Sequence, residues 1–331
     1  MELLIIALAA CLASASATKA LLPWLARRGI VARENDRSMH SGIVPKGGGL
    51  PLLLSALAAL TALTPPMKLS LALLASTAAL AMVSWQDDKK PLPASWRLIM
   101  HFAVAAFFVL SLPEDALVLQ GYVPLIVDRA LTIVALVWMI NLYNFMDGIN
   151  GIAGTETVAI TAGYLAIGAT ALVNLSYQPV AAALLGASAG FLLWNLRDRA
   201  LVFLGDAGSA PLGLLMGALT IDLAVHGAWA AALILPAYFF ADATLTLLRR
   251  IATGHMPWSA HKTHFYQRAA AAWRSHVAVV WRVAVAGALL IAAALWSMSA
   301  PWLALVLAAG IVTGLLVILN AAAQSRSSGN D

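Results

Sequence analysis

Residues 157–196 read TVAITAGYLAIGATALVNLSYQPVAAALLGASAGFLLWNL and contain no Asp, Glu, Lys or Arg. An apolar helix needs roughly 20 residues to cross a bilayer, so this stretch is too long for a single crossing. Asn174, Ser176, Gln178 and Pro179 lie near its middle and favour a turn there. We therefore expect two membrane-spanning helices joined by a short polar loop.

The composition of the whole chain agrees with a membrane protein. Of its 331 residues, 62% are hydrophobic and 11% are charged, whereas soluble proteins carry roughly 25% charged residues. The mean hydropathy of +0.86 excludes disordered, fibrous and ordinary soluble classes. The single cysteine, Cys11, excludes an intramolecular disulfide and a cysteine zinc site.

Apolar segments recur along the chain and predict an all-α polytopic membrane protein with a single domain over residues 1–331. About eleven membrane-spanning helices are expected, at residues 3–22, 48–64, 69–86, 96–112, 124–144, 155–173, 178–194, 208–225, 228–248, 278–298 and 301–320. Residues 324–331 form a polar tail that we expect to be frayed.

Basic residues predict how the chain is oriented. Glu2 precedes the first apolar run and Lys19 and Arg27 follow it, so the N-terminus is expected outside. Eighteen of the twenty Lys and Arg residues then fall at inner loops or inner helix ends, and the C-terminus lies inside. The alternative is a cleaved signal peptide, because Ala13-Ser14-Ala15 resembles a cleavage site, although such peptides carry positive charge before the apolar core.

The inner loops contain almost every polar residue that could take part in chemistry. The first loop contains Asn35, Arg37 and Lys46 and ends in the glycines 47–49 at the mouth of the second span. Glycines let a backbone approach a phosphate closely, although no P-loop motif is present. A basic loop beside a membrane also serves simply to attract anionic lipid, and that alternative stays open.

Two adjacent aspartates, Asp87 and Asp88, close the third span and are followed by Lys89 and Lys90. Neighbouring carboxylates near a bilayer repel each other unless a cation attends them. A divalent metal ion would supply that cation, and neutralisation by the two lysines in a solvated turn is the alternative.

A row of polar residues ends the fifth span. Asn141, Asn144 and Asp147 follow one another at intervals of three, which places them along one side of a helix that Gly148 would end. Amides in an apolar helix also serve as contacts between helices. Because the row ends in Asp-Gly at the water boundary, it favours a ligand or metal site.

Another aspartate, Asp206, stands between Gly205 and Gly208 and follows Asn195 and Phe203. The glycines allow a tight turn at a helix N-terminus, where a carboxylate can face a hard cation. A simple capping aspartate is the alternative.

The largest inner loop contains His261, Lys262, His264 and Arg268. If this part of the loop is helical, the two histidines and Arg268 share one face, a geometry suited to phosphate oxygens. A zinc site is disfavoured because the chain has no HExxH motif and only one cysteine.

Acidic and basic clusters that are separate in sequence thus fall on one membrane face. Metal-assisted phosphoryl transfer requires carboxylates that hold a metal ion and cations that hold phosphates. An apolar groove between the membrane spans would admit a lipid substrate. The alternative is a membrane transporter or lipid flippase with a cytoplasmic polar site. Transporters place ionisable groups near the bilayer midplane, where this chain has few, and one of these, Asp242, could pair with Arg249.

These motifs resemble those of the polyprenyl-phosphate N-acetylhexosamine-1-phosphate transferases. The similar elements are Asp87-Asp88, Asn141-x-x-Asn144-x-x-Asp147-Gly148, Phe203-x-Gly205-Asp206-x-Gly208-Ser209 and the loop His261-Lys262-x-His264-x-Tyr266-Gln267-Arg268. They occur in this order over nearly the whole chain. The family is glycosyltransferase family 4, whose superfamily includes phospho-MurNAc-pentapeptide translocase, and the resemblance implies an N-terminus in the periplasm, a cytoplasmic C-terminus and an active site built from cytoplasmic loops.

The resemblance implies an activity and its partners. A sugar 1-phosphate would pass from a UDP-N-acetylhexosamine to undecaprenyl phosphate in the bacterial inner membrane, with release of UMP, as the initiating step of O-antigen or lipopolysaccharide-like synthesis. The implied cofactor is Mg²⁺, with Mn²⁺ as a substitute. No nucleic acid partner is expected, and Gly310-x-x-x-Gly314 is a weak indication of a homodimer in the lipid bilayer.

The same resemblance assigns roles to residues. The four aspartates Asp87, Asp88, Asp147 and Asp206 would be catalytic, with Asp206 and Asp88 at the metal. The residues implied at the substrates are Asn35, Arg37, Lys46, Asn141, Asn144, Asn195, Phe203, His261, Lys262, His264 and Arg268. Phe203 would stack on uracil, and Asp87 would contact or deprotonate the lipid phosphate.

Two features refine the resemblance. Lys89, Lys90 and Pro91 stand where some members carry a third acid or a lysine, so that position departs from the pattern. The His loop resembles that of O-antigen and amino-sugar initiating members, unlike the triple-His form of the peptidoglycan enzyme. A MurNAc-pentapeptide substrate is therefore not expected.

Overall fold

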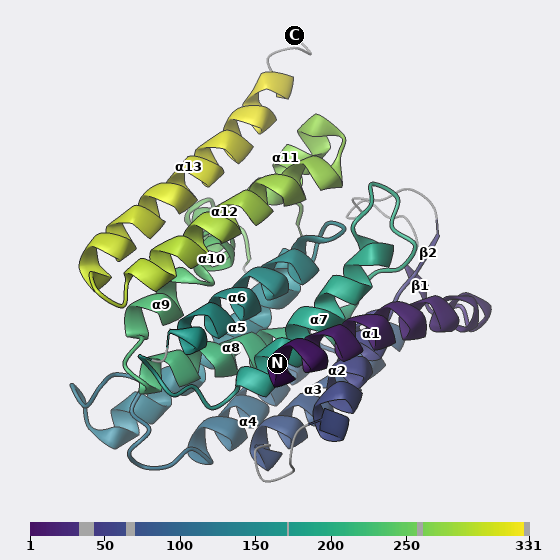
Figure 1. The fold of residues 1–331 in the computed structure, drawn as a ribbon. Helices are drawn as coiled ribbons and strands as arrows, with labels where there is room; N and C mark the ends of the chain where they lie inside the picture. Colours follow the sequence, from purple (N-terminus) through teal and green to yellow (C-terminus); the bar gives the residue numbers. More distant parts are fainter. Residues whose placement is uncertain (33–42, 64–69, 171, 257–260, 328–331) are drawn as a thin grey trace.

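The computed structural model describes residues 1–32, 43–63, 70–170, 172–256 and 261–327 (Figure 1). Two predicted site residues, Asn35 and Arg37, lie outside them. The described residues form thirteen helices and two short strands. These are α1 (Glu2–Arg27), β1 (Val31–Ala32), β2 (Val44–Pro45), α2 (Gly49–Leu63), α3 (Leu71–Lys89), α4 (Ala94–Leu110), α5 (Leu125–Met146), α6 (Ile152–Ala169), α7 (Gln178–Asn195), α8 (Asp206–Val225), α9 (Trp229–Ile234), α10 (Ala237–Ala252), α11 (Phe265–Trp273), α12 (His276–Trp296) and α13 (Pro301–Ser327).

Six of these helices are long and apolar enough to cross a membrane, namely α1, α5, α6, α8, α12 and α13. The protein is therefore a polytopic membrane protein made almost entirely of helices. Ten of the eleven predicted spans each correspond to one helix, although the number that cross the bilayer stays a prediction. The last helix, α13, continues to Ser327 and so runs into the predicted polar tail.

The ninth predicted span, 228–248, is wrong as a single helix. It consists of α9 and α10, which are separated at Leu235 and Pro236. Proline has no backbone N–H and its ring clashes with the preceding turn, so a helix ends before it. The amides at the start of α10 then lack helical partners, and the backbone of Phe239 there lies beside the carboxyl group of Glu156 in α6.

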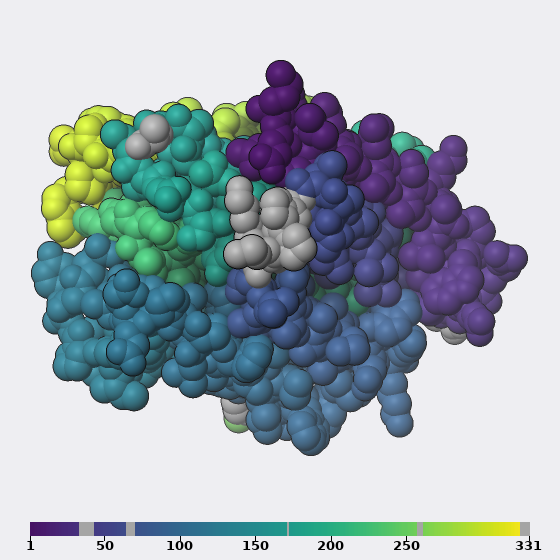
Figure 2. Space-filling model, turned by 60° about the horizontal axis from the view of Figure 1, so that its bottom comes forward, coloured from purple at the N-terminus to yellow at the C-terminus, as the bar shows by residue number. Residues whose placement is uncertain are grey.

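Small residues set the closest helix contacts. Gly186 and Gly190 of α7 face the backbone of α1 at Ala7 and Cys11, where a Cβ atom would find no room. Figure 1 shows α12 and α13 side by side on one flank, while α8, nearly all of whose residues are buried, runs through the middle. In Figure 2, α1 (purple) lies along the outside of the body. Gly310 and Gly314 of α13 face open space, and the expected homodimer stays a prediction.

The loops that were predicted to be inner meet at one end of the bundle. Strands β1 and β2 pair antiparallel, and Lys46, directly after β2, forms a parallel bridge with Phe203 ahead of α8. The side chain of Asp88 at the end of α3 bonds the first amides of α8, and that of Asp198 after α7 bonds the start of α12. This end of the bundle contains the predicted site.

Candidate active site

Glycines join the segment before α2 to the segment before α8. The amides of Gly47 and Gly48 donate to the carbonyl oxygen of Phe203 over 3.2 and 2.8 Å, and the amide of Gly49 donates to Leu204 O over 2.9 Å. A Cβ on Gly208 would lie 2.7 Å from the Cα of Gly49, so these backbones touch. The sequence predicted that the glycine triplet lets the backbone approach a phosphate. In the structure, the triplet instead lets two segments of the chain pack closely against each other.

The carboxylate of Asp88 stands at the N-terminus of α8. It accepts hydrogen bonds from the amides of Asp206 and Ala207, each over 3.0 Å, and lies 2.6 Å from Lys46 Nζ. Its side chain is fully buried. Gly205 provides the required turn at φ +77°, and a Cβ there would lie 2.8 Å from Asp88 Oδ2. Asp88 therefore caps α8 from another helix, so the capping aspartate is Asp88 and Asp206 remains free to face the site.

Arg97 lies between two of the predicted catalytic carboxylates. Its Nη1 is 3.3 Å from Asp87 Oδ2 and 3.8 Å from Asp206 Oδ2, while the amide of Leu92 also donates to Asp87. The carboxylates of Asp87 and Asp206 thus face the same guanidinium nitrogen. The side chain of Asp206 is 29% exposed and so remains accessible to a ligand.

The four predicted catalytic aspartates share this region with two cations, Lys46 and Arg97. Burial alone would lower the pKa of Lys46, but the carboxylates of Asp206, Asp88 and Asp87 raise it above its ordinary value, so Lys46 stays charged. Burial raises the pKa of Asp147 well above its ordinary range, Asp206 and Asp88 raise it further, and Lys46 opposes them. Even with Asp147 protonated, the three other carboxylates outnumber the two cations.

This excess of negative charge fits a divalent cation. Among the described residues, no three His, Cys, Asp or Glu side chains stand together in a metal-binding group. Mg²⁺ is commonly held by only one or two carboxylates together with waters and substrate phosphates, so the donor set fits Mg²⁺. Both oxygens of Asp88, a predicted ligand, are already engaged, whereas Asp206 presents an accessible carboxylate.

The predicted asparagines support the surrounding backbone. Asn195 accepts a hydrogen bond from the Gly151 amide over 2.6 Å and donates to Val202 O over 2.8 Å. Asn144 donates to Ser209 Oγ in the first turn of α8 over 3.0 Å. Asn141 donates to a carbonyl of its own helix. The predicted row ends one residue beyond α5, with Asp147 as the residue that follows the helix.

The predicted helical face in the His loop is wrong, because α11 begins only at Phe265. His264 precedes the helix, and its ring stacks on that of His261 with the ring centroids 5.0 Å apart. Burial, His264 and Arg250 lower the pKa of His261 to about 4, so that this ring is neutral near pH 7. Lys262 is half-buried, and Arg268 lies within α11.

The His loop reaches the acidic cluster through Tyr266. Its hydroxyl donates to Phe145 O over 2.9 Å, two residues before Asp147. Burial, together with the charges of Asp242 and Asp147, raises the pKa of Tyr266 well above its ordinary value, so Tyr266 remains a neutral donor.

From the sequence, three residues that contact this site were assigned no role in it. Arg97, Asp242 and Tyr266 all contact site residues, and the predicted pairing of Asp242 with Arg249 is wrong because Asp242 bonds the His loop. A signal was present for two of them, since Arg97 and Asp242 are charged residues inside predicted apolar spans.

Known proteins resemble this chain over most of its length. Residues 70–224 match the model of glycosyl transferase family 4, a range that contains all four predicted catalytic aspartates. A decaprenyl-phosphate N-acetylglucosaminephosphotransferase of Mycobacterium tuberculosis is 28% identical, with 84% of this chain and 78% of the relative covered. A probable undecaprenyl-phosphate N-acetylglucosaminyl 1-phosphate transferase of Bacillus subtilis is 26% identical over 75% and 72% of the two chains.

A third relative has a different name. The phospho-N-acetylmuramoyl-pentapeptide-transferase of Halalkalibacterium halodurans is 33% identical, with 60% of this chain and 68% of the relative covered. These similarities support a transferase and not the alternative transporter. The chain belongs to glycosyl transferase family 4, among the polyprenyl-phosphate N-acetylhexosamine-1-phosphate transferases, and it is a phospho-sugar transferase.

Proposed function

We propose that this protein transfers an N-acetylhexosamine 1-phosphate from a UDP-sugar to undecaprenyl phosphate, giving undecaprenyl-diphosphate-sugar and UMP. The reaction takes place on the cytoplasmic face of a bacterial inner membrane and initiates an O-antigen or lipopolysaccharide-like glycan. The observation that carries the proposal is the cluster of four aspartates with Lys46 and Arg97 beside Phe203, at the end of the bundle where the basic loops meet.

Asp206 is the proposed main ligand of Mg²⁺, with Asp147 and Asp88 nearby. When bound, Mg²⁺ would neutralise negative charge on the diphosphate and on the leaving UMP. Lys46 and Arg97 would orient phosphate oxygens, and Lys262 and Arg268 of the His loop are further cations for the same purpose. Phe203 would stack on uracil, while Asn141, Asn144 and Asn195 hold the backbone around the nucleotide.

The proposed chemistry is a direct in-line displacement. An oxygen of the lipid phosphate forms a bond to the β-phosphorus of the UDP-sugar while the bond from that phosphorus to the oxygen of UMP breaks. Asp87, held by Arg97 and the Leu92 amide, would orient the attacking phosphate and accept its proton if one is present. Recovery of a phosphorylated Asp87 from enzyme and UDP-sugar without lipid would overturn direct displacement.

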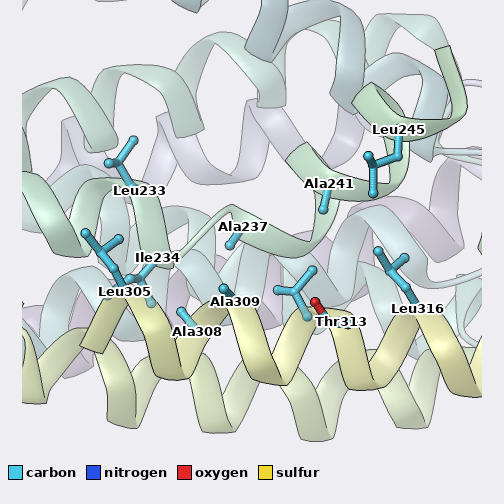
Figure 3. Close-up of a pocket in the computed structure, with 11 residues that line it drawn as sticks. Leu233, Ile234, Ala237, Ala241, Leu245, Leu305, Ala308, Ala309, Thr313 and Leu316 are labelled. Carbon is cyan, nitrogen blue, oxygen red and sulfur yellow. The ribbon is translucent and has the colours of Figure 1, made fainter. Parts of the chain in front are cut away.

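An apolar groove is the proposed site of the polyprenyl chain. It has a volume of about 320 Å³ and lies where α9 and α10 face α13 (Figure 3). Leu233 and Leu305 line one end of the groove and Leu245 and Leu316 line the other, so the groove runs lengthwise along α13. Thr313 contributes the only hydroxyl among its lining residues, which suits a hydrocarbon occupant.

The test is release of UMP by purified protein in detergent. The assay contains undecaprenyl phosphate, Mg²⁺ and one donor at a time from a panel of UDP-N-acetylhexosamines, with UDP-GlcNAc and its 6-deoxy relatives first. We expect release with at least one donor, dependent on the lipid. Chelation of the metal should abolish it, and added Mg²⁺ or Mn²⁺ should restore it.

Matched variants make the test specific. Asp206→Asn removes the accessible carboxylate and should reduce release by about 100-fold or more. Asp115→Asn removes an exposed carboxylate in the loop between α4 and α5 and should leave release unchanged. Folded protein that releases no UMP with any donor, or full activity in Asp206→Asn, would contradict the proposal.

A further inference from the structure

A buried carboxylate outside the acidic cluster holds the His loop. Asp242 lies in α10, and its side chain is fully buried. Its Oδ1 is 3.1 Å from His264 Nδ1 and accepts a hydrogen bond from the Phe265 amide over 3.1 Å. Its Oδ2 accepts from the Tyr266 amide over 3.1 Å. One side chain thus binds three successive residues of the loop.

Neighbours on α10 hold this carboxylate in place. Tyr238 and Thr246, one turn before and one turn after Asp242, each place a hydroxyl 3.3 Å from it. The carboxylate therefore occupies the N-terminus of α11, where the first amides of a helix have no helical partners. The residue that precedes α11, His264, makes no side-chain cap of its own, so Asp242 supplies the cap from another helix.

This contact also fixes the chemistry of His264. The carboxylate of Asp242 can only accept a hydrogen bond, so Nδ1 is the ring nitrogen of His264 that carries a proton toward it. His264 is stacked between His261 and Tyr266, with ring centroids 5.0 and 5.5 Å away, and Tyr266 reaches the backbone beside Asp147. Asp242 thus orients one side of the site without touching the acidic cluster.

We propose that Asp242 is a positioning residue of the transfer reaction, which holds His264 and the start of α11 in the orientation that the UDP-sugar requires. The inference rests on the proposed function. Asp242 acts through His264. Removal of the carboxylate should therefore lower activity only while the imidazole of His264 is present.

A double-mutant cycle tests this dependence. Asp242→Asn keeps the volume but places an amide N–H against one of the donors, and we expect kcat/KM for the UDP-sugar to fall about tenfold to 100-fold. His264→Ala should cause a fall of similar size. The double variant should be no worse than His264→Ala alone, whereas multiplied losses or an unaffected Asp242→Asn would overturn the proposal.

Hydrogen exchange of the backbone amides measures whether Asp242 holds the start of α11 in place, independently of the transfer reaction. In Asp242→Asn the amides of Phe265 and Tyr266 should exchange faster, while those of α12 are unchanged. Asp222→Asn is the matched control, because Asp222 is a buried aspartate that bonds Tyr164 and the Ser176 amide at the other end of the bundle. This control should change neither the exchange of the His loop nor kcat/KM. Lack of UMP release by the unaltered protein would overturn the proposed function, and unchanged exchange in Asp242→Asn would overturn the positioning role.

Discussion

At the scale of single residues, the site depends on side chains that hold other groups in place. Asp88 receives two backbone amides of α8 and the ammonium group of Lys46, so its charge fixes where Asp206 points. A carboxamide at this position has one acceptor oxygen, and its N–H group would face either an amide or a cation.

We therefore expect Asp88→Asn to lower both stability and activity. The lost charge-assisted bonds should cost about 1–3 kcal/mol of unfolding free energy, and displacement of Asp206 should reduce UMP release about tenfold or more. Thermal unfolding in detergent and the release assay measure the two effects. Unfolding and activity equal to those of the unaltered protein would show that the cap is dispensable.

His261 should make the fold sensitive to acid. Its pKa of about 4 lies below the value of about 6.5 of an unfolded chain, so between these values the unfolded state binds more protons. Stability contributed by the neutral ring is thus complete above about pH 6.5 and is lost as the pH falls toward 4. In His261→Gln the unfolding temperature should therefore drop by about 2 °C less between pH 6.5 and pH 4 than in the unaltered protein. The effect is small because solvent screens the half-buried ring.

Unfolding temperatures between pH 4.5 and 7 test this prediction. His255→Gln is the control, because His255 is an exposed histidine of the same inner segment. Identical pH profiles of the unfolding temperature for the unaltered protein and His261→Gln would contradict the lowered pKa of His261.

Residue types and spacing predicted the four aspartates that the structure brings to one end of the bundle. Asp87 and Asp147 stand at the end of an apolar run and Asp206 at the start of one, where a charge is visible in the sequence alone. The roles of Arg97 and Asp242 were not visible, because they depend on contacts between helices: Asp206 is 109 positions away from Arg97, and His264 is 22 positions away from Asp242. The glycines 47–49 were recognised, but the sequence does not say which segment they approach.

At the scale of elements, ten of the eleven predicted segments each contain one helix, whereas the ninth contains two. The apolar character of 228–248 continues through the break, because hydropathy does not record that Pro236 lacks a donor. The apolar groove spans this interruption, because residues of both α9 and α10 line it opposite α13 (Figure 3).

Filling this groove should weaken use of the lipid. Ala309 of α13 lines the groove, and Ala309→Phe adds a ring to it. We expect KM for undecaprenyl phosphate to rise about tenfold while KM for the UDP-sugar is unchanged, because a blocked hydrocarbon site costs about 1.4 kcal/mol of binding. Val317→Phe on the exposed surface of α13 is the control. Equal changes in both KM values would contradict the assignment of the groove.

At the scale of the whole molecule, the loops that share a predicted side of the membrane lie at one end of the bundle. The orientation of that end follows from the distribution of basic residues, which predicts that it faces the cytoplasm.

Cysteine labelling in intact cells tests this orientation. On a Cys11→Ala background, Tyr122→Cys introduces an exposed thiol between α4 and α5, and Lys90→Cys introduces one at the opposite end. A membrane-impermeant maleimide should label the first and not the second until the cells are opened. Labelling of the thiol at position 90 in intact cells would reverse the assigned orientation.

The pairing of Lys46 with Asp88 has a consequence for biogenesis. Lys46 and Asp88 are both synthesised more than a hundred residues before Asp206. Asp88 therefore enters the membrane when its counterion, Lys46, is already present. The amides of α8 later join an existing ion pair, because one carboxylate can accept several donors. A nascent chain of three helices therefore already contains the cation that pairs with Asp88, and the translocon does not have to shelter this carboxylate until α8 is made.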